Sequence, residues 1–231
     1  LGCRTGDFFF LEQPDAFAQQ RLVVDLVSRR LPKSYGYDPL RDIQVITPAK
    51  QGPLGTRELN RLLQGKLNPP ERGKGEATLM GRTLREGDKV MQIRNNYDII
   101  WQQPDGTAGT GIFNGDMGII EMLDPGSKTI QVRFEEKLAT YSFENQDQLE
   151  HAYAVTVHKS QGSEFEAVVM PLERRHPRLH YRNLLYTAVT RARRLLIMTG
   201  QKETVYAMVQ NNRRTLRYTN QKEMLQEMCD E

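Results

Sequence analysis

The chain has 231 residues and a net charge of +3, and its 38% hydrophobic and 26% charged residues argue against disorder and allow one domain with a small insert. No apolar run approaches the ~18 residues that cross a bilayer, and Cys3 and Cys229 form no C-x-x-C pair, so we expect no membrane contact, disulfide framework or metal site, and a cytoplasmic location. Leu1 is not a methionine, so we also expect part of a longer protein.

The first segment alternates helix and strand patterns, which is typical of a parallel α/β sheet. Residues 14–30 predict a helix, residues 43–47 (I-Q-V-I-T) a short strand that Pro48 ends, and the residues after the loop A-K-Q-G-P-L-G a second helix that stops at Pro69-Pro70. The side chains expected on the buried faces of the two helices are Phe17, Leu22, Val23, Leu26 and Val27, then Leu59, Leu62, Leu63 and Leu67.

Short alternating runs separated by turn residues follow, which indicates an all-β module. The candidate strands are residues 89–94, 111–113, 117–122, 129–134 and 139–142. Asn114-Gly115 predicts a type I′ hairpin turn, in which both residues have positive φ, and Asp124-Pro125-Gly126 predicts another turn. Five short strands predict a small barrel at residues 72–149, which we expect to be separable from its host.

The α/β pattern then resumes, so the barrel is an insertion within one α/β domain formed by residues 1–71 and 150–231. Residues 152–157 and 167–170 are apolar runs of the kind that a sheet covered on both faces requires. A helix at residues 183–192, a strand at 195–199 and a closing helix from about Lys202 complete the pattern.

The stretch Y-A-V-T-V-H-K-S-Q-G-S-E-F at residues 153–165 leads from a strand into a polar loop. Ligands of such sheets bind where loops leave the carboxyl ends of strands, so we expect residues 156–164 on the functional rim. Period-two alternation would put Thr156 and His158 on one side, where a hydroxyl and an imidazole suit phosphate oxygens. The alternative is a polar loop whose side chains only satisfy one another.

A second stretch, N-L-L-Y-T-A-V-T-R-A-R-R-L-L-I-M-T-G at residues 183–200, predicts a buried helix face, with Arg191 near the helix end. Tyr186 is expected to pack in the core, and the alternative is a platform on which a base stacks. Arg191 is either a surface cation or a group that stabilises charge in phosphoryl transfer. Residues 171–194 hold seven arginines against one acid, which is typical of a solvated face or of a nucleic-acid contact.

These stretches resemble a known family. T-V-H-K-S-Q-G-S-E-F resembles motif V, and L-L-Y-T-A-V-T-R-A resembles motif VI, of superfamily 1 helicases. The loop T-P-A-K-Q-G-P-L-G-T, the helix end L-N-P-P, and the strings G-D-K-V-M-Q-I-R-N-N-Y-D and F-N-G-D-M-G resemble the RecD-like branch. The resemblance implies a second RecA-like motor domain of the P-loop NTPase type, interrupted by an SH3-like barrel, in an ATP-dependent 5′ to 3′ DNA helicase of repair or recombination.

The resemblance also implies residue roles. Arg191 matches the arginine finger, and Gly162 and Glu164 match positions that face the nucleotide. The positions expected to contact single-stranded DNA are Thr156, His158, Lys159 and Ser160, with Thr47, Lys50 and Gly52 on the earlier loop. The implied partners are single-stranded DNA, an upstream RecA-like domain and, in some members, subunits of a nuclease complex.

The sequence contains no G-x-x-x-x-G-K-[ST] loop to hold nucleotide phosphates and no strand-ending D-E pair to hold magnesium. We therefore expect ATP and Mg²⁺ to be held mainly by the upstream domain, and this chain to be inactive alone. Two alternatives stay open: the helicase portion of a conjugative relaxase, and a non-catalytic module that binds nucleic acid.

Overall fold

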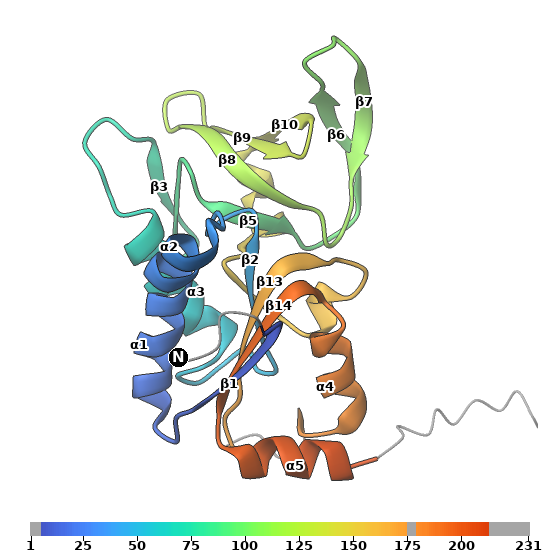
Figure 1. The fold of residues 1–231 in the computed structure, drawn as a ribbon. Helices are drawn as coiled ribbons and strands as arrows, with labels where there is room; N and C mark the ends of the chain where they lie inside the picture. Colours follow the sequence, from blue (N-terminus) through green and yellow to red (C-terminus); the bar gives the residue numbers. More distant parts are fainter. Residues whose placement is uncertain (1–5, 175–178, 213–231) are drawn as a thin grey trace, which may run out of the picture.

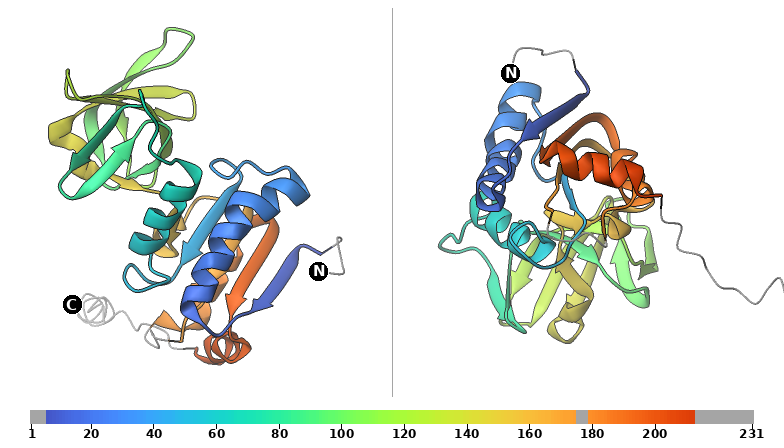
Figure 2. Two further views of the ribbon diagram at one scale, coloured as in Figure 1. Left: turned by 90° about the vertical axis from the view of Figure 1, so that its left-hand side faces the viewer. Right: turned by 90° about the horizontal axis from the view of Figure 1, so that it is seen from below.

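A computed structural model describes residues 6–174 and 179–212, which form an α/β part and a β part (Figures 1 and 2). The α/β part is a sheet of five parallel strands in the order β1-β14-β13-β2-β12. Its strands are β1 (Phe8–Glu12), β2 (Ile43–Thr47), β12 (Ala154–Thr156), β13 (Phe165–Pro171) and β14 (Ala192–Gly200). The predicted parallel α/β sheet is thus confirmed, and β2 has its predicted bounds.

Helices cover both faces of this sheet because successive strand residues are apolar on both sides. The helices are α1 (Ala16–Asp25), the π-helical segment η1 (Leu26–Arg30), α2 (Leu31–Tyr35), α3 (Thr56–Leu67), α4 (Arg182–Val189) and α5 (Lys202–Gln210). Val45 and Val169 pack with α1, η1 and α3, whereas Ile46 and Val168 pack with α4 and α5. The two faces are visible to the left and right of the sheet in Figure 1.

The first helical stretch differs from the prediction at both ends. Asp15 caps α1, accepting a hydrogen bond from the Ala18 amide at 2.7 Å, and helical residues continue through η1 to Tyr35. Phe17 is 62% exposed, so its predicted burial is wrong. The residues of the predicted face that follow it do pack toward the sheet, among them Val23, Leu26 and Val27.

The β part is an antiparallel sheet in the order β11-β5-β8-β9-β10-β6-β7, with a two-stranded hairpin beside it. The sheet strands are β5 (Lys89–Gln92), β6 (Asn96–Gln102), β7 (Ala108–Ile112), β8 (Met117–Asp124), β9 (Thr129–Phe134), β10 (Lys137–Ser142) and β11 (Leu149–His151). The hairpin is β3 (Glu76–Leu79) with β4 (Arg82–Arg85), and a 3-10 helix, η2 (Phe143–Gln148), precedes β11. The all-β prediction is confirmed, although it omitted β3, β4, β6 and β11.

One predicted turn is right and one is wrong. Residues 125–128 form the turn between β8 and β9, and Asp124 accepts from the Gly126 amide at 2.8 Å. At Asn114-Gly115 only Gly115 has a positive φ, and the turn joins β7 to β8, which are not paired with each other. It is therefore not a type I′ hairpin, because that turn needs positive φ at both residues and two paired strands.

The β part is joined to the α/β part by more than its two chain connections. Met91 of β5 is 1% exposed and belongs to the core of the α/β part, and β11 extends the β sheet to His151, past the predicted boundary at residue 149. Because Met91 of the insert fills part of its host's core, we predict that removal of the insert disturbs the α/β part.

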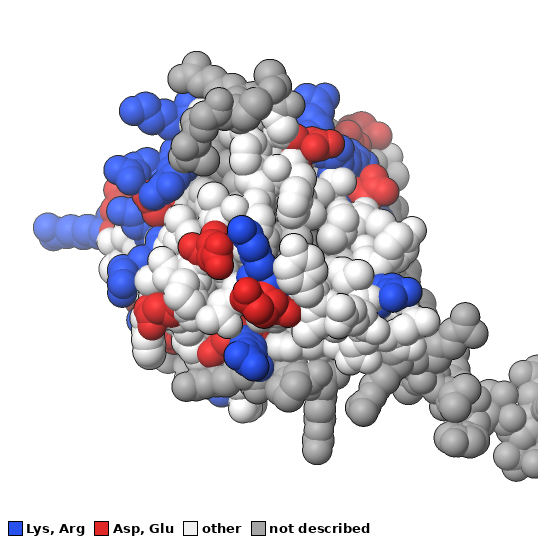
Figure 3. Space-filling view, turned by 60° about the horizontal axis from the view of Figure 1, so that its bottom comes forward, with Lys and Arg blue, Asp and Glu red and all other residues white. Residues whose placement is uncertain are grey.

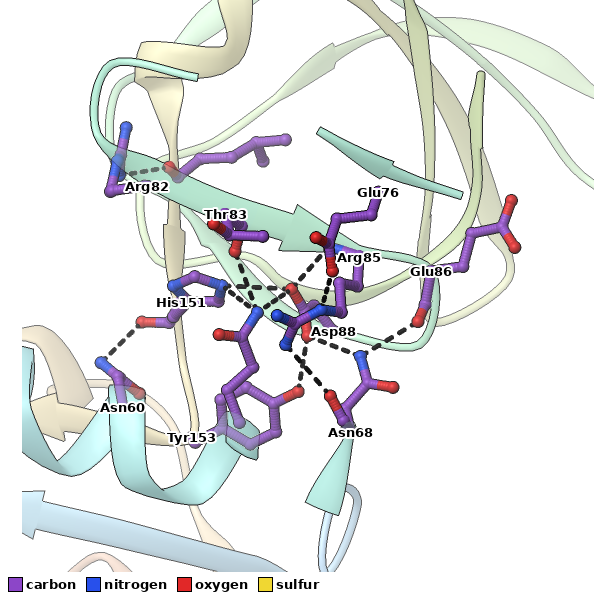
Figure 4. A network of polar contacts seen from close by, with 12 residues as sticks. Asn60, Asn68, Glu76, Arg82, Thr83, Arg85, Glu86, Asp88, His151 and Tyr153 are labelled. Carbon is purple, nitrogen blue, oxygen red and sulfur yellow. Dashed lines mark hydrogen bonds and ion pairs between the residues drawn. The ribbon is translucent and has the colours of Figure 1, made fainter. Parts of the chain in front are cut away.

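A buried carboxylate also lies at this junction (Figure 4). Asp88 is 0% exposed and accepts hydrogen bonds from five donors. We call Asp88 and these five donors the Asp88 network. The donors and their distances are Asn68 Nδ2 (2.6 Å), Gln64 Nε2 (2.7 Å), the Arg85 amide (2.8 Å), Tyr153 Oη (2.9 Å) and His151 Nε2 (3.1 Å). The network ties α3 and β4 to the segment that leads into β12.

Burial by itself raises the pKa of the Asp88 carboxyl, but the hydrogen bond and charge of His151 and the hydrogen bond of Asn68 outweigh burial and hold this pKa below its usual value. Burial and the neighbouring Asp88 carboxylate raise the pKa of the Tyr153 hydroxyl. The network is therefore arranged for an ionised Asp88 and a protonated Tyr153.

Candidate functional site

The motif after β12 begins with a tight turn and not with further strand. Thr156 is the last strand residue, Val157 has helical φ and ψ, and residues His158–Ser160 form a 3-10 turn, η3. The expectation that Thr156 and His158 share one side of a strand is therefore wrong, because the alternation of side chains ends where the strand ends.

Two hydroxyls expected to contact DNA are buried inside this turn. Thr156 is 6% exposed and accepts from the Lys159 amide at 3.4 Å, and Ser160 is 0% exposed and donates to the Val157 carbonyl at 2.8 Å. Both hydroxyls stabilise the turn, which is the role that the alternative interpretation gave the loop. His158 is exposed, with its Nε2 atom 3.4 Å from the Tyr181 hydroxyl.

The strand before this turn is held from the side by α3. β12 is an edge strand, and the Asn60 side chain accepts from the Ala154 amide at 2.7 Å and donates to the Ala154 carbonyl at 2.9 Å. Asn60 thus provides the hydrogen bonds that a neighbouring strand would provide. No sequence pattern singled it out, because its partner lies 94 residues later in the chain.

The loop after β2 lies next to the loop after β12, since Thr47 pairs with Thr156 at the ends of these parallel strands. Thr47 is 2% exposed and donates to the Leu54 carbonyl at 2.7 Å, so its hydroxyl shapes the loop. Lys50 and Gly52 are exposed, and Gly52 has a φ of 91°. Of the residues predicted for DNA, the structure thus brings Lys50, His158 and Lys159 to one edge of the sheet as accessible groups.

Arg191 and Glu164 lie toward the opposite side of the sheet, at the amino ends of β14 and β13. Thr156 pairs with Thr47 at the carboxyl end of β2, whereas Ala167 pairs with Ile43 at its amino end. The two pairings are four residues, or about 13 Å, apart along β2. Glu164 precedes Ala167, and the Phe165 amide donates to the Arg191 carbonyl at 2.9 Å. The expectation that residues 156–164 lie on one rim is therefore wrong, because the loop runs from the carboxyl end of β12 to the amino end of β13.

The Arg191 side chain joins the two motifs. Its Nη1 atom donates to the Ser163 carbonyl at 3.0 Å, Nε donates to the Thr187 carbonyl at 3.1 Å, and Nη2 donates to the Thr190 hydroxyl at 3.1 Å. Carbonyl and hydroxyl acceptors leave the positive charge of the guanidinium uncompensated. Ser163, which the sequence did not single out, is thus one of the contacts between the two motifs.

The neighbouring groups are open to solvent. Glu164 is exposed and pairs with Arg193 at 3.0 Å. Gly162 has a φ of 87°, and a Cβ atom there would have no neighbour within 4 Å. Tyr186 on α4 is 69% exposed, so its predicted place in the core is wrong.

Of the arginines predicted as a basic block, three have hydrogen-bond or ion-pair partners within the described part of the chain. Arg193 and Arg194 pair with Glu164 and Glu166, and Arg182 donates to the Val209 carbonyl at 2.7 Å. Arg175 and Arg178 lie outside the described residues. Figure 3 brings the bottom of Figure 1 forward, where α5 lies, and the described side chains on that face are mostly uncharged.

Within the described ranges there is no group of three or more His, Cys, Asp or Glu side chains that could hold a metal ion. Likewise, no helix among the residues that the structure describes is long and apolar enough to cross a membrane.

Comparison with known proteins gives two matches that lie next to each other. The family model of the ATP-dependent RecD-like DNA helicase SH3 domain matches residues 59–134, and that of the UvrD-like helicase C-terminal domain matches residues 151–199. The first match covers most of α3 and the strands from β3 to β9, and the second covers both motifs.

Curated relatives agree with these matches. The ATP-dependent RecD2 DNA helicase of Deinococcus radiodurans is 36% identical over 151 residues, which are 65% of this chain and 19% of that protein. The RecBCD enzyme subunit RecD of Mycobacterium tuberculosis is 29% identical over 168 residues, 73% of this chain and 26% of that protein. A solved Pif1 helicase from Bacteroides aligns at a TM-score of 0.47 and 16% identity, over 92% of this chain and 50% of that one. The chain thus spans about a fifth to a quarter of the length of these two curated relatives.

Proposed function

We propose that this chain is the C-terminal region of a RecD-like helicase and acts as the second motor domain of a 5′ to 3′ DNA helicase. The proposal is supported by the match to the SH3 domain of ATP-dependent RecD-like DNA helicases, followed by the match to the UvrD-like helicase C-terminal domain. ATP and Mg²⁺ would be held mainly by a first RecA-like domain, with Arg191 facing the nucleotide across the cleft. The enzyme would act in the cytoplasm on single-stranded DNA.

The observation that carries this proposal is the Arg191 side chain. Among the residues that the structure describes, the hydrogen-bond partners of its charged guanidinium are neutral acceptors of its own domain, Thr187, Thr190 and Ser163. Such a cation is available to stabilise the charge that develops on the transferred phosphoryl group. Gly162 and Glu164 lie on the same loop and would approach the nucleotide, where Glu164 would exchange its Arg193 partner for a ribose hydroxyl.

DNA would bind at the other end of the same loop. Lys50, His158 and Lys159 offer two ammonium groups and an imidazole at the carboxyl ends of β2 and β12, and such groups contact phosphates without reading bases. The segment from η3 to Ser163 then connects the DNA contacts with the Arg191 contact. Through this segment, movement at the nucleotide would reach the DNA.

The test is Arg191→Ala in the complete helicase. Loss of an arginine finger lowers ATP turnover by about 10³-fold, with much smaller changes in nucleotide and DNA binding. Arg194→Ala is the matched control, since it removes a neighbouring cation that is 75% exposed and pairs with Glu166. Near-normal turnover in Arg191→Ala would make Arg191 a surface cation and reject the proposal.

Two further measurements bear on the same proposal. The 231-residue chain alone should show no ATPase activity, since it lacks a phosphate-binding loop. Copurification of nuclease subunits with the tagged complete helicase would assign it to a RecBCD-type assembly, and their absence would indicate a helicase that acts without them.

A further inference from the structure

The DNA end of the proposed site contains an acidic residue that the proposed function does not use. Glu150 of β11 lies opposite Met91 of β5, so its side chain is on the barrel face that packs toward the α/β part. Its Oε2 atom is 2.7 Å from the Nζ atom of Lys159, and the two side chains are 43% and 24% exposed. Lys159, a proposed phosphate contact, is thus already paired with a carboxylate.

Two more cations lie around Glu150. Burial by itself raises the pKa of this carboxyl, but the hydrogen bond and charge of Lys159 and the charges of Lys50 and Arg82 outweigh burial and lower the pKa. Arg82, at the start of β4, also donates to the Leu149 carbonyl at 2.8 Å (Figure 4). Lys159 thus contacts the carboxylate itself, Arg82 is bound to the adjacent residue, and Lys50 adds its charge.

This arrangement has the charge pattern of a phosphate site. Lys159 contacts the Glu150 carboxylate directly, and the charges of Lys50 and Arg82 add to the positive field around it. A phosphate of a bound DNA backbone would be attracted to the same place and could take the same lysine. The carboxylate is attached to the protein and cannot leave. It therefore competes with every phosphate that reaches Lys159.

We infer that Glu150 is a built-in competitor for the DNA backbone, which holds Lys159 in the absence of DNA and must give it up when a phosphate binds. The inference rests on the proposed function, since it requires single-stranded DNA at this edge. It makes Glu150 a residue that tunes affinity and not a catalytic residue. A motor that releases and rebinds phosphates at each step needs such a limit on its affinity for the DNA backbone.

Glu150→Gln tests the inference by removing the charge and keeping the shape. In the complete helicase without nucleotide, fluorescence anisotropy with an oligothymidylate should show tighter binding by about fivefold at low salt, the equivalent of one ion pair of about 1 kcal/mol. The variant should also have a steeper salt dependence. A freed lysine releases one more counterion on binding, which changes the slope of log K against log salt by about −0.7 for single strands.

Controls separate the inference from the proposed function. Glu121→Gln also removes one negative charge from a barrel glutamate, one that pairs with Arg133 away from this edge, and it should leave affinity and slope unchanged. In the double variant of Glu150→Gln with Lys159→Ala, the gain in affinity should disappear. Melting temperatures of the single variants should stay close to that of the wild type, because the pair is partly exposed.

Each failure has its own meaning. If Lys159→Ala alone leaves DNA binding unchanged, no phosphate reaches this lysine and the proposed DNA contact is wrong. If Lys159→Ala weakens binding while Glu150→Gln changes neither affinity nor slope, the DNA contact stands and the competitor is refuted. An equal gain in Glu121→Gln would mean that net charge alone sets the affinity, which also refutes it.

Discussion

Replacing Asp88 with asparagine should weaken the junction between the barrel and the α/β part. The wild-type carboxylate accepts five hydrogen bonds with no exposed surface. An asparagine side chain has one acceptor oxygen, and its amide group would face donors such as Asn68. At least two hydrogen bonds to a charged group are lost, and at about 1.5–3 kcal/mol for each the free energy of unfolding should fall by about 3 kcal/mol or more.

The chain contains separate spectroscopic reporters for its two parts. Trp101 of β6 is the single tryptophan and reports unfolding of the barrel by fluorescence, whereas the described α-helices all belong to the α/β part and report its unfolding by circular dichroism at 222 nm. In urea the two signals of the wild type should change together. In Asp88→Asn the midpoints should fall, and the two transitions should separate.

The pH dependence follows from the direction of the pKa shift. Since the folded-state pKa of Asp88 lies below its ordinary value of 3.8, the group stabilises the fold above that pH, and this contribution is lost as the pH falls through the folded-state pKa. Asp88→Asn should therefore lose less stability in that acidic range than the wild type. Asp105→Asn, at an exposed turn, should leave the midpoint unchanged. A loss below about 1 kcal/mol with coincident transitions would refute the reasoning.

Lys89→Met should raise the free energy of unfolding at pH 7 by about 3 kcal/mol, because burial lowers the pKa of this 4% exposed lysine from 10.5 to about 8. The wild type, but not the variant, should gain stability as the pH rises from 8 to 10.5, and a variant that unfolds at a lower urea concentration than the wild type would contradict this. Ser160→Ala should lower the melting temperature while leaving the DNA affinity of the complete helicase unchanged, because its hydroxyl is used inside the turn, and weakened DNA binding at normal stability would count against this role. Deletion of residues 76–149 with the ends joined should abolish cooperative unfolding, because Met91 is then lost from the core of the α/β part. A deletion variant that still unfolds cooperatively would instead support the expectation that the barrel is separable.

Much of the fold can be predicted from the sequence because its signals are local. The strand at residues 43–47 and that at 129–134 have their predicted bounds, since each is a run of β-branched or alternating residues that turn residues delimit. The insertion of a barrel within an α/β domain also follows from the sequence pattern, which changes from alternating helices and strands to short alternating runs and then changes back. The two motifs indicate the helicase family because they are strings of adjacent residues.

The tertiary structure decided which side chains are accessible. Thr47, Thr156 and Ser160 have the residue types that contact phosphates, yet each hydroxyl is bound within its own turn. The strand after Ala154 ends two residues later, so alternation could not place His158. These outcomes depend on how each turn closes, and residue type alone does not encode that.

The sequence by itself determined the fold class, the order of the parts and the presence of Arg191 and Lys159. Only the tertiary structure decided that Arg191 contacts the Ser163 carbonyl and that Lys159 faces Glu150. It also decided that Asp88 ties the barrel to its host through Tyr153, 65 residues away in the chain. The physical reason is that hydrogen bonds and charges act over a few ångströms in space. Their partners are fixed only when strands and helices pack, and that packing leaves no periodic pattern in the sequence.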